Sequence, residues 1–214
     1  MTSKITMFLI AGVVALGMFL GFSNNDNPHG SKTPELLLKQ NNQDGNISNP
    51  NSPSLAITFV DSLNGANDTT SLKARGYKVY YRGGGAQGLT ATWFQGNSAN
   101  WPAFNGPATG YVSANYNVVT GTNNIDSWLV SPRLNIAAGD SLMFWERTVA
   151  ANPFPDSMRI MYSATGDSTP EASSWVELGR FRNTETGSWA QRKYRLATAG
   201  ANARFALRYN VVNG

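Results

Sequence analysis

Few side chains in this sequence could catalyse a reaction. The only histidine, His29, lies in a polar stretch rich in Asn and Pro, and the chain has no cysteine. A Ser-His-Asp triad, a histidine general base, a histidine-containing zinc site and every thiolate site therefore lack their central residue. The glycine-rich stretch Gly83–Gly88 lacks the Gly-Lys-Ser/Thr ending and the following helix that a phosphate-binding loop needs. We interpret it as a loop between strands.

Carboxylates are the remaining candidates for acid–base chemistry, because a suitably spaced pair can hydrolyse a glycosidic bond. The acidic residues considered are Asp61, Asp68, Asp126, Glu146, Asp156 and Glu177. The sequence alone does not say which of them lie together, so it assigns no catalytic pair. We therefore expect a chain that is not an enzyme, with a glycan hydrolase of sandwich fold as an alternative.

Aromatic residues form the most concentrated group of candidate binding residues. They are Trp93, Phe94, Trp101, Phe104, Tyr111 and Tyr116, interspersed with Asn, Gly and Ser. Flat rings in such a setting stack on sugar faces, and the alternative is that most of them fill the core. Trp101 precedes a proline and is expected to be the exposed ring, because Trp-Pro fits poorly in a central strand. We assign ligand binding to Trp101, Trp93 and Phe104.

Short alternating segments, separated by Gly, Asn, Asp and Pro, must position these residues. Strands are predicted near residues 55–61, 76–82, 91–95, 110–116, 126–131, 140–148, 157–164, 174–181, 189–197 and 202–209. In the last of these, Phe205, Leu207 and Tyr209 should point inward and the arginines outward. No window shows a long helical period, so the pattern favours an all-β antiparallel sandwich or barrel.

Two segments precede this domain. Residues 1–23 have a charged start and an apolar run, which predicts a secretory signal peptide, with an uncleaved signal anchor as the alternative. Residues 24–54 are rich in Asn, Ser, Pro and Gln and are predicted to be a disordered linker. Residues 55–214 then form one β-sandwich domain, and either outcome for the first segment predicts export to the cell surface or beyond.

The distribution of charge argues against a nucleic-acid-binding protein. Only 14% of the residues are charged, and the net charge of +4 comes from 17 basic and 13 acidic residues that are scattered along the chain. A nucleic-acid footprint would need Lys and Arg clustered on one face. We therefore expect no nucleic-acid partner, and contact with a membrane only through the apolar first segment.

Several motifs in their order resemble the choice-of-anchor J and cleaved-adhesin domains of bacterial surface and secreted proteins. The matching segments are Thr92–Asn97, Phe104–Pro107, Trp128–Pro132, Leu142–Trp145, Tyr162–Asp167, Trp175–Leu178 and Trp189. The resemblance implies a MAM-like jelly roll that serves as an adhesion or ligand-binding module, with carbohydrate or protein as the ligand. A purely structural accessory domain of a larger surface protein is the alternative.

The same resemblance implies a structural calcium ion, held by an acidic residue after the first strand and one near the last. Asp61 matches the first position, and Asp68 is a weaker neighbour. A calcium ion wants six or more oxygen ligands, which loop carbonyls could complete. The resemblance also implies a closing strand after residue 209, which the last five residues do not match. We therefore expect a sandwich that lacks its last strand.

Overall fold

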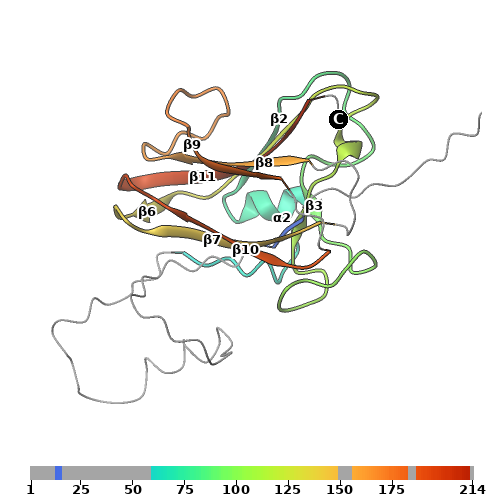
Figure 1. Cartoon of the computed structure of the whole chain (residues 1–214), viewed down its shortest axis with the longest axis horizontal. Coiled ribbons are helices and arrows are strands. Elements are labelled where there is room, and N and C mark those ends of the chain that lie inside the picture. Colours follow the sequence, from blue (N-terminus) through green and yellow to red (C-terminus); the bar gives the residue numbers. More distant parts are fainter. Residues whose placement is uncertain (1–12, 16–58, 149–155, 183–186, 213–214) are drawn as a thin grey trace, which may run out of the picture.

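Two antiparallel sheets face each other in the computed structural model, which describes residues 13–15, 59–148, 156–182 and 187–212. Figure 1 shows them as two layers, with β8, β9 and β11 in one and β7 and β10 in the other. The strands are β1 Val13–Ala15, β2 Lys78–Tyr81, β3 Phe94–Gln95, β4 Val112–Ser113, β5 Ile125–Val130, β6 Leu134–Ile136, β7 Ser141–Arg147, β8 Ser157–Ser163, β9 Val176–Arg182, β10 Ala190–Arg195 and β11 Gly200–Val211. This confirms the predicted all-β antiparallel sandwich.

The longest strand, β11, organises the six-stranded sheet. This sheet has the order β2-β5-β11-β8-β9, and β6 also pairs with β11. The register places Arg208 opposite Trp128 on β5 and opposite Arg159 on β8. The five-stranded sheet has the order β10-β7-β1-β4-β3. Because side chains alternate along each strand, each sheet presents one face to the core and one to the outside.

The core between the sheets is apolar and receives alternate residues of the long strands. Leu129, Phe144, Ile160 and Leu207 are all buried in it. On β11 the residues Phe205, Leu207 and Tyr209 belong to this core, as the alternation predicted. The intervening residues of β5, β8 and β11 therefore face away from the core, where they build the site described below.

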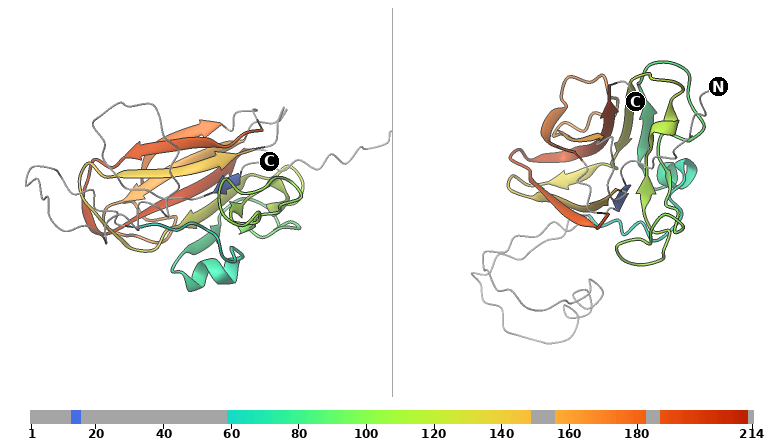
Figure 2. Two further views of the ribbon diagram at one scale, coloured as in Figure 1. Left: turned by 90° about the horizontal axis from the view of Figure 1, so that it is seen from below. Right: turned by 45° about the vertical axis from the view of Figure 1, so that its right-hand side comes forward.

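Four elements of the described residues were not predicted: the helix α2, the strand β6, the 3₁₀ helix Tyr116–Val118 and the strand β1. The helix α2, Thr69–Ala74, begins after Asp68, whose side chain accepts hydrogen bonds from the backbone N–H groups of Thr70 and Ser71. Figure 2 shows it at the outside of the sandwich. A helix this short carries too little periodicity to be recognised, although Asp68 is a typical N-cap residue. Strand β6 was missed because it has three residues and follows a proline.

The predicted strand at residues 55–61 is wrong over its described residues, 59–61. Residues 59–61 are not in a strand, and 55–58 lie outside the described residues. The Asp61 carboxylate accepts a hydrogen bond from the N–H of Leu63, which has a φ of 53°. This local turn competes with extended pairing.

The predicted linker at residues 24–54 lies outside the described residues, and so does most of the predicted signal segment. Within that segment, Val13–Ala15 forms β1, which pairs with β4 and β7. The assignment of residues 1–23 as a signal peptide or anchor stays a prediction. Among the residues that the structure describes, no helix is long and apolar enough to cross a membrane.

Candidate functional site

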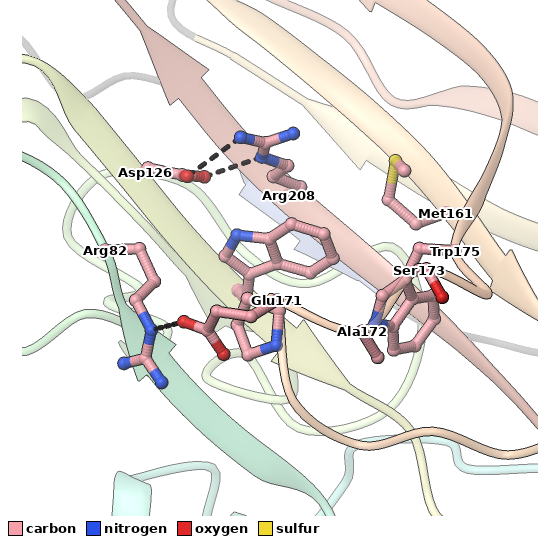
Figure 3. Close-up of a pocket in the computed structure, with 10 residues that line it drawn as sticks. Arg82, Asp126, Met161, Glu171, Ala172, Ser173, Trp175 and Arg208 are labelled. Atoms are coloured by element: carbon pink, nitrogen blue, oxygen red, sulfur yellow. Dashed lines mark hydrogen bonds and ion pairs between the residues drawn. The ribbon is translucent and has the colours of Figure 1, made fainter.

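A pocket lies on the outer face of the six-stranded sheet, where the loop between β8 and β9 folds back over it. Its volume is about 410 Å³, which is within the range of about 300–1,000 Å³ that small-ligand sites occupy. We call it the Trp128 pocket, and it is lined by Arg82, Asp126, Trp128, Met161, Pro170, Glu171, Ala172, Ser173, Trp175 and Arg208. Figure 3 shows Arg82 at one end of the pocket, and Met161 and Trp175 at the other.

Trp128 forms the floor of the pocket. It stands on the outward side of β5, and only 2% of its surface is exposed. The Arg208 guanidinium lies 4.8 Å from the centre of its ring, and the Trp175 ring lies 5.7 Å away at an angle of 56°. The indole N–H of Trp128 is buried and has no hydrogen-bond partner among the residues that the structure describes, and its nitrogen has almost no exposed surface, so it is closed to a ligand in the pocket.

Asp126 and Arg208 make the first of two ion pairs in the pocket. The Arg208 Nε lies 2.6 Å from Asp126 Oδ1, and its Nη2 lies 2.8 Å from Oδ2. This is a bidentate pair between neighbouring strands, a geometry that fixes both side chains. Each group keeps unused lone pairs or N–H groups on its outer side, which are able to bind hydroxyl groups.

Arg82 and Glu171 make the second ion pair, through the Arg82 Nε and a Glu171 carboxylate oxygen. Arg82 also lies over the Tyr80 ring, 5.0 Å from its centre. The hydrogen bond from Arg82 lowers the pKa of the Glu171 carboxyl below its ordinary value. Glu171 is therefore an ionised acceptor at neutral pH and a poor proton donor.

The loop that covers the pocket is held in place by its own hydrogen bonds. The indole N–H of Trp175 donates to the carbonyl of Thr169 at 2.8 Å, and the hydroxyls of Ser163 and Ser174 are 2.7 Å apart. Gly166 turns the loop with a φ of 79°, and a Cβ there would lie 2.0 Å from the carbonyl oxygen of Asn202. These contacts position the half-buried Trp175 before any ligand arrives.

The predicted ligand-binding residues do not line this pocket. Trp93 is fully buried in the core, and Trp101 is 5% exposed, so the expectation that Trp101 is the exposed ring was wrong. The Arg147 guanidinium covers the Trp101 ring at 5.1 Å. Phe104 is 45% exposed, as a surface ring must be, and stacks on Trp145 on the other sheet.

The predicted calcium ligands are occupied by other partners. The Asp61 carboxylate accepts from Arg75 at 3.2 Å and from the N–H of Leu63 at 2.9 Å. Asp68 caps α2. Among the described residues, no group of three or more acidic or histidine side chains could hold a metal ion. A calcium site at Asp61 and Asp68 stays a prediction, and it would have to replace these contacts.

Sequence reasoning missed the residues that do line the pocket. Trp128 and Trp175 were recognised only as parts of strand motifs, and Arg208 only as an outward residue. A signal was present, because Asp126, Trp128 and Val130 alternate on one side of β5. The pairing of β5 with β11, which brings Asp126 to Arg208, joins residues 82 positions apart in the chain. No local sequence pattern predicts which residues such a long-range strand pairing brings together.

Among the residues that the structure describes, two carboxyl groups have a raised pKa, and neither lines the pocket. Burial raises the pKa of Glu146, although its ion pair with Arg192 at 2.7 Å opposes the shift. Burial also raises the pKa of Asp156, which accepts a hydrogen bond from the hydroxyl of Tyr209.

The solved structures that match this chain include the following two. The K3 cleaved adhesin domain of Lys-gingipain from Porphyromonas gingivalis is 22% identical, with a TM-score of 0.39, over 58% of this chain and 86% of that one. A family 29 carbohydrate-binding module from Piromyces equi is 12% identical, with a TM-score of 0.17, over 62% of this chain and 78% of that one. No family model matches the sequence, and no curated protein matches it.

Proposed function

We propose that this chain is a non-catalytic glycan-binding module of an exported bacterial protein, and that the Trp128 pocket holds one sugar residue. The observation that carries the proposal is the partly buried Trp175 ring, held by its own hydrogen bond beside a pocket of about 410 Å³ whose two ion pairs leave it without net charge. A flat ring next to paired polar groups suits the apolar face and the hydroxyl groups of a sugar.

The apolar part of the pocket suits the carbon face of a sugar ring. Met161 and the half-buried Trp175 stand at one end, beside the buried Trp128. Aromatic rings offer a large flat area at a small cost in conformational entropy. The carbohydrate would lie against Trp175, with its hydroxyl groups turned toward the ion pairs.

The polar part suits an uncharged sugar. Each arginine in the pocket is already paired with a carboxylate, Arg208 with Asp126 and Arg82 with Glu171, so the pocket carries no net charge. Paired carboxylates accept from hydroxyl groups, and the arginine N–H groups that remain donate to them. A ligand with its own charge would meet no unpaired opposite charge here.

The same pairing argues against hydrolysis. An acid catalyst in a glycosidase keeps its proton through a raised pKa. In the pocket, the hydrogen bond from Arg82 lowers the pKa of Glu171 instead. Among the described residues, the two carboxyl groups with raised pKa values, Glu146 and Asp156, lie outside it.

The test is a glycan array probed with the wild-type chain, Trp175→Ala and Phe104→Ala. Phe104 is the matched control, because it is also a partly exposed aromatic ring but belongs to the other sheet. We expect neutral glycans to bind the wild type and Phe104→Ala, and to lose at least tenfold in affinity for Trp175→Ala. Absence of binding by a folded wild type would favour the purely structural accessory role. Release of reducing sugar from any bound glycan would show a hydrolase.

A further inference from the structure

A second surface lies on the outer face of the five-stranded sheet, on the opposite side of the sandwich from the Trp128 pocket. On β7 the residues Leu142, Phe144 and Glu146 are buried, so Met143, Trp145 and Arg147 face outward. On β10 the exposed residues are Gln191, Lys193 and Arg195. The register pairs Gln191 with Trp145 and Lys193 with Met143. We call these six residues, together with Phe104, the β7–β10 face.

The cations of this face have no counter-charge. Arg147, Lys193 and Arg195 make no ion pair with any residue that the structure describes, and the six strand positions of the face include no carboxylate. The neighbouring inward residue behaves differently, because Arg192 pairs with Glu146 at 2.7 Å. Three unpaired positive charges on one side of one sheet attract an anionic partner.

An aromatic platform lies between these charges. Phe104 stacks on Trp145 with ring centres 3.7 Å apart and an angle of 15° between the planes. Trp189 meets Phe104 edge-on at 6.4 Å, and its indole N–H donates to the carbonyl of Pro102 at 3.2 Å. Phe104 remains 45% exposed, so it is the outermost ring of the stack. Packing from below fixes its orientation.

The spacing of the charges fits an extended chain with separated negative groups. Lys193 and Arg195 are two positions apart on β10, which is about 7 Å. Arg147 lies four positions along β7 from Met143, the partner of Lys193, which is about 13 Å. Trp145 and its partner Phe104 lie between the two ends. Single-stranded nucleic acid, by contrast, uses several stacking rings in a groove of denser positive charge.

We propose that the β7–β10 face binds an anionic polysaccharide, with carboxylate or sulfate groups on Lys193, Arg195 and Arg147 and one sugar ring on Phe104. This site is separate from the Trp128 pocket, whose ion pairs are internally neutral. It would let one domain hold an acidic polymer on one side and a neutral sugar on the other. The proposal does not depend on ligand binding in the Trp128 pocket.

The test uses two pairs of polymers that differ in charge. Polygalacturonate is compared with its methyl ester, and dextran sulfate with dextran, by titration calorimetry on the full chain. We expect at least tenfold tighter binding of one or both anionic members, and affinity that falls as salt is raised. The first pair tests whether carboxylate groups are bound, and the second pair tests whether sulfate groups are bound. Equal affinity for the charged and neutral members, or tighter binding of an oligo(dT) strand, would overturn the proposal.

Three variants locate the binding. The double variant Lys193→Gln/Arg195→Gln and the single variant Phe104→Ala should each lose at least fivefold in affinity for the anionic polymer. Lys73→Gln, an exposed lysine on α2, is the charge control, and Leu89→Ala, an exposed apolar residue outside both sites, is the control for Phe104→Ala. Both controls should bind as the wild type does. Equal losses in Lys73→Gln would show general charge attraction and would contradict the site. Thermal unfolding of each variant confirms that it is folded.

Discussion

Asp126 and Arg208 meet across the neighbouring strands β5 and β11 in a bidentate ion pair, with contacts of 2.6 and 2.8 Å. The same guanidinium lies over Trp128, so one arginine joins a carboxylate and an indole at the floor of the pocket. The sheet register sets this arrangement, since Arg208 lies directly opposite Trp128. The chemistry of the site is therefore a consequence of strand pairing.

We expect the ion pair to stabilise the fold as well as the pocket. Arg208→Ala should lower the free energy of unfolding by about 1–3 kcal/mol, because it leaves the largely buried Asp126 without its partner. The double variant Asp126→Asn/Arg208→Ala should lose less than the sum of its two single variants. Urea unfolding of all four proteins measures this coupling. Strict additivity would contradict the pairing.

Trp128→Phe separates binding from folding. The change removes the unpaired N–H and keeps an aromatic ring. The lost packing contacts lower the free energy of unfolding, and the removal of an unsatisfied donor raises it. The free energy of unfolding should change by less than about 1.5 kcal/mol. Affinity for a neutral glycan should change by less than about threefold, because the buried N–H is closed to the ligand. A loss of about tenfold or more would show that this donor reaches the ligand and would contradict its burial.

Asp156 should make stability depend on pH. Burial raises its pKa above the ordinary 3.8, so between pH 3.8 and the raised pKa the unfolded chain releases a proton that the folded chain keeps. Rising pH therefore favours unfolding in that window, by at most about 1.4 kcal/mol per pH unit. Above the raised pKa the loss is complete.

Asp156→Asn lacks this titration, and its amide oxygen can still accept from Tyr209. We expect the wild type to lose stability relative to the variant as pH rises through this window. Unfolding free energies of both proteins, measured from pH 3 to 8, check this. A difference between the two proteins that is constant with pH would contradict the shift. The residual pH dependence of the variant includes Glu146, whose pKa burial also raises.

Asp68→Ala tests whether this residue caps a helix or binds calcium. Its carboxylate accepts from the N–H groups of Thr70 and Ser71 at 2.9 and 3.0 Å. Loss of the cap should lower the midpoint of thermal unfolding, because two backbone N–H groups lose their acceptor. The decrease should be the same in calcium and in chelator. A decrease that appears only in calcium would identify Asp68 as a ligand and contradict the capping role.

The sequence predicted the fold better than the site. Alternation is local, so the outward position of Arg208 on β11 and most strand positions could be predicted directly. Arg204 was also expected on the outside, but it is buried and donates to the carbonyls of Gly166 and Ser131. Whether a side chain is exposed depends on contacts with residues that are distant in the sequence. Trp101 looked like a surface ring beside a proline, yet Arg147 covers it, and the two residues are far apart in the chain. The helix at Thr69–Ala74 is too short for periodicity to reveal.

The pocket could not be predicted from the sequence, because it too depends on contacts between residues that are distant in the chain. It combines β2, β5, β8, β11 and the loop before β9, and only the register of the sheet brings Arg82, Asp126 and Arg208 to one face. Phe104 is the one predicted ligand-binding ring that is well exposed, and it belongs to the other sheet. The composition therefore predicted an exposed aromatic ring, which Phe104 provides, but not the place of the pocket.

The most direct test of the Trp128 pocket is the response of its indole N–H to a bound glycan. The six tryptophans give separate indole signals in a ¹H–¹⁵N spectrum, and Trp128→Phe and Trp175→Phe assign the two that matter. A neutral glycan selected on the array is then titrated into the ¹⁵N-labelled chain. We predict that the Trp128 and Trp175 signals shift with saturation, while that of Trp93 in the core does not. Saturating binding that leaves Trp128 and Trp175 unmoved would contradict the proposed site.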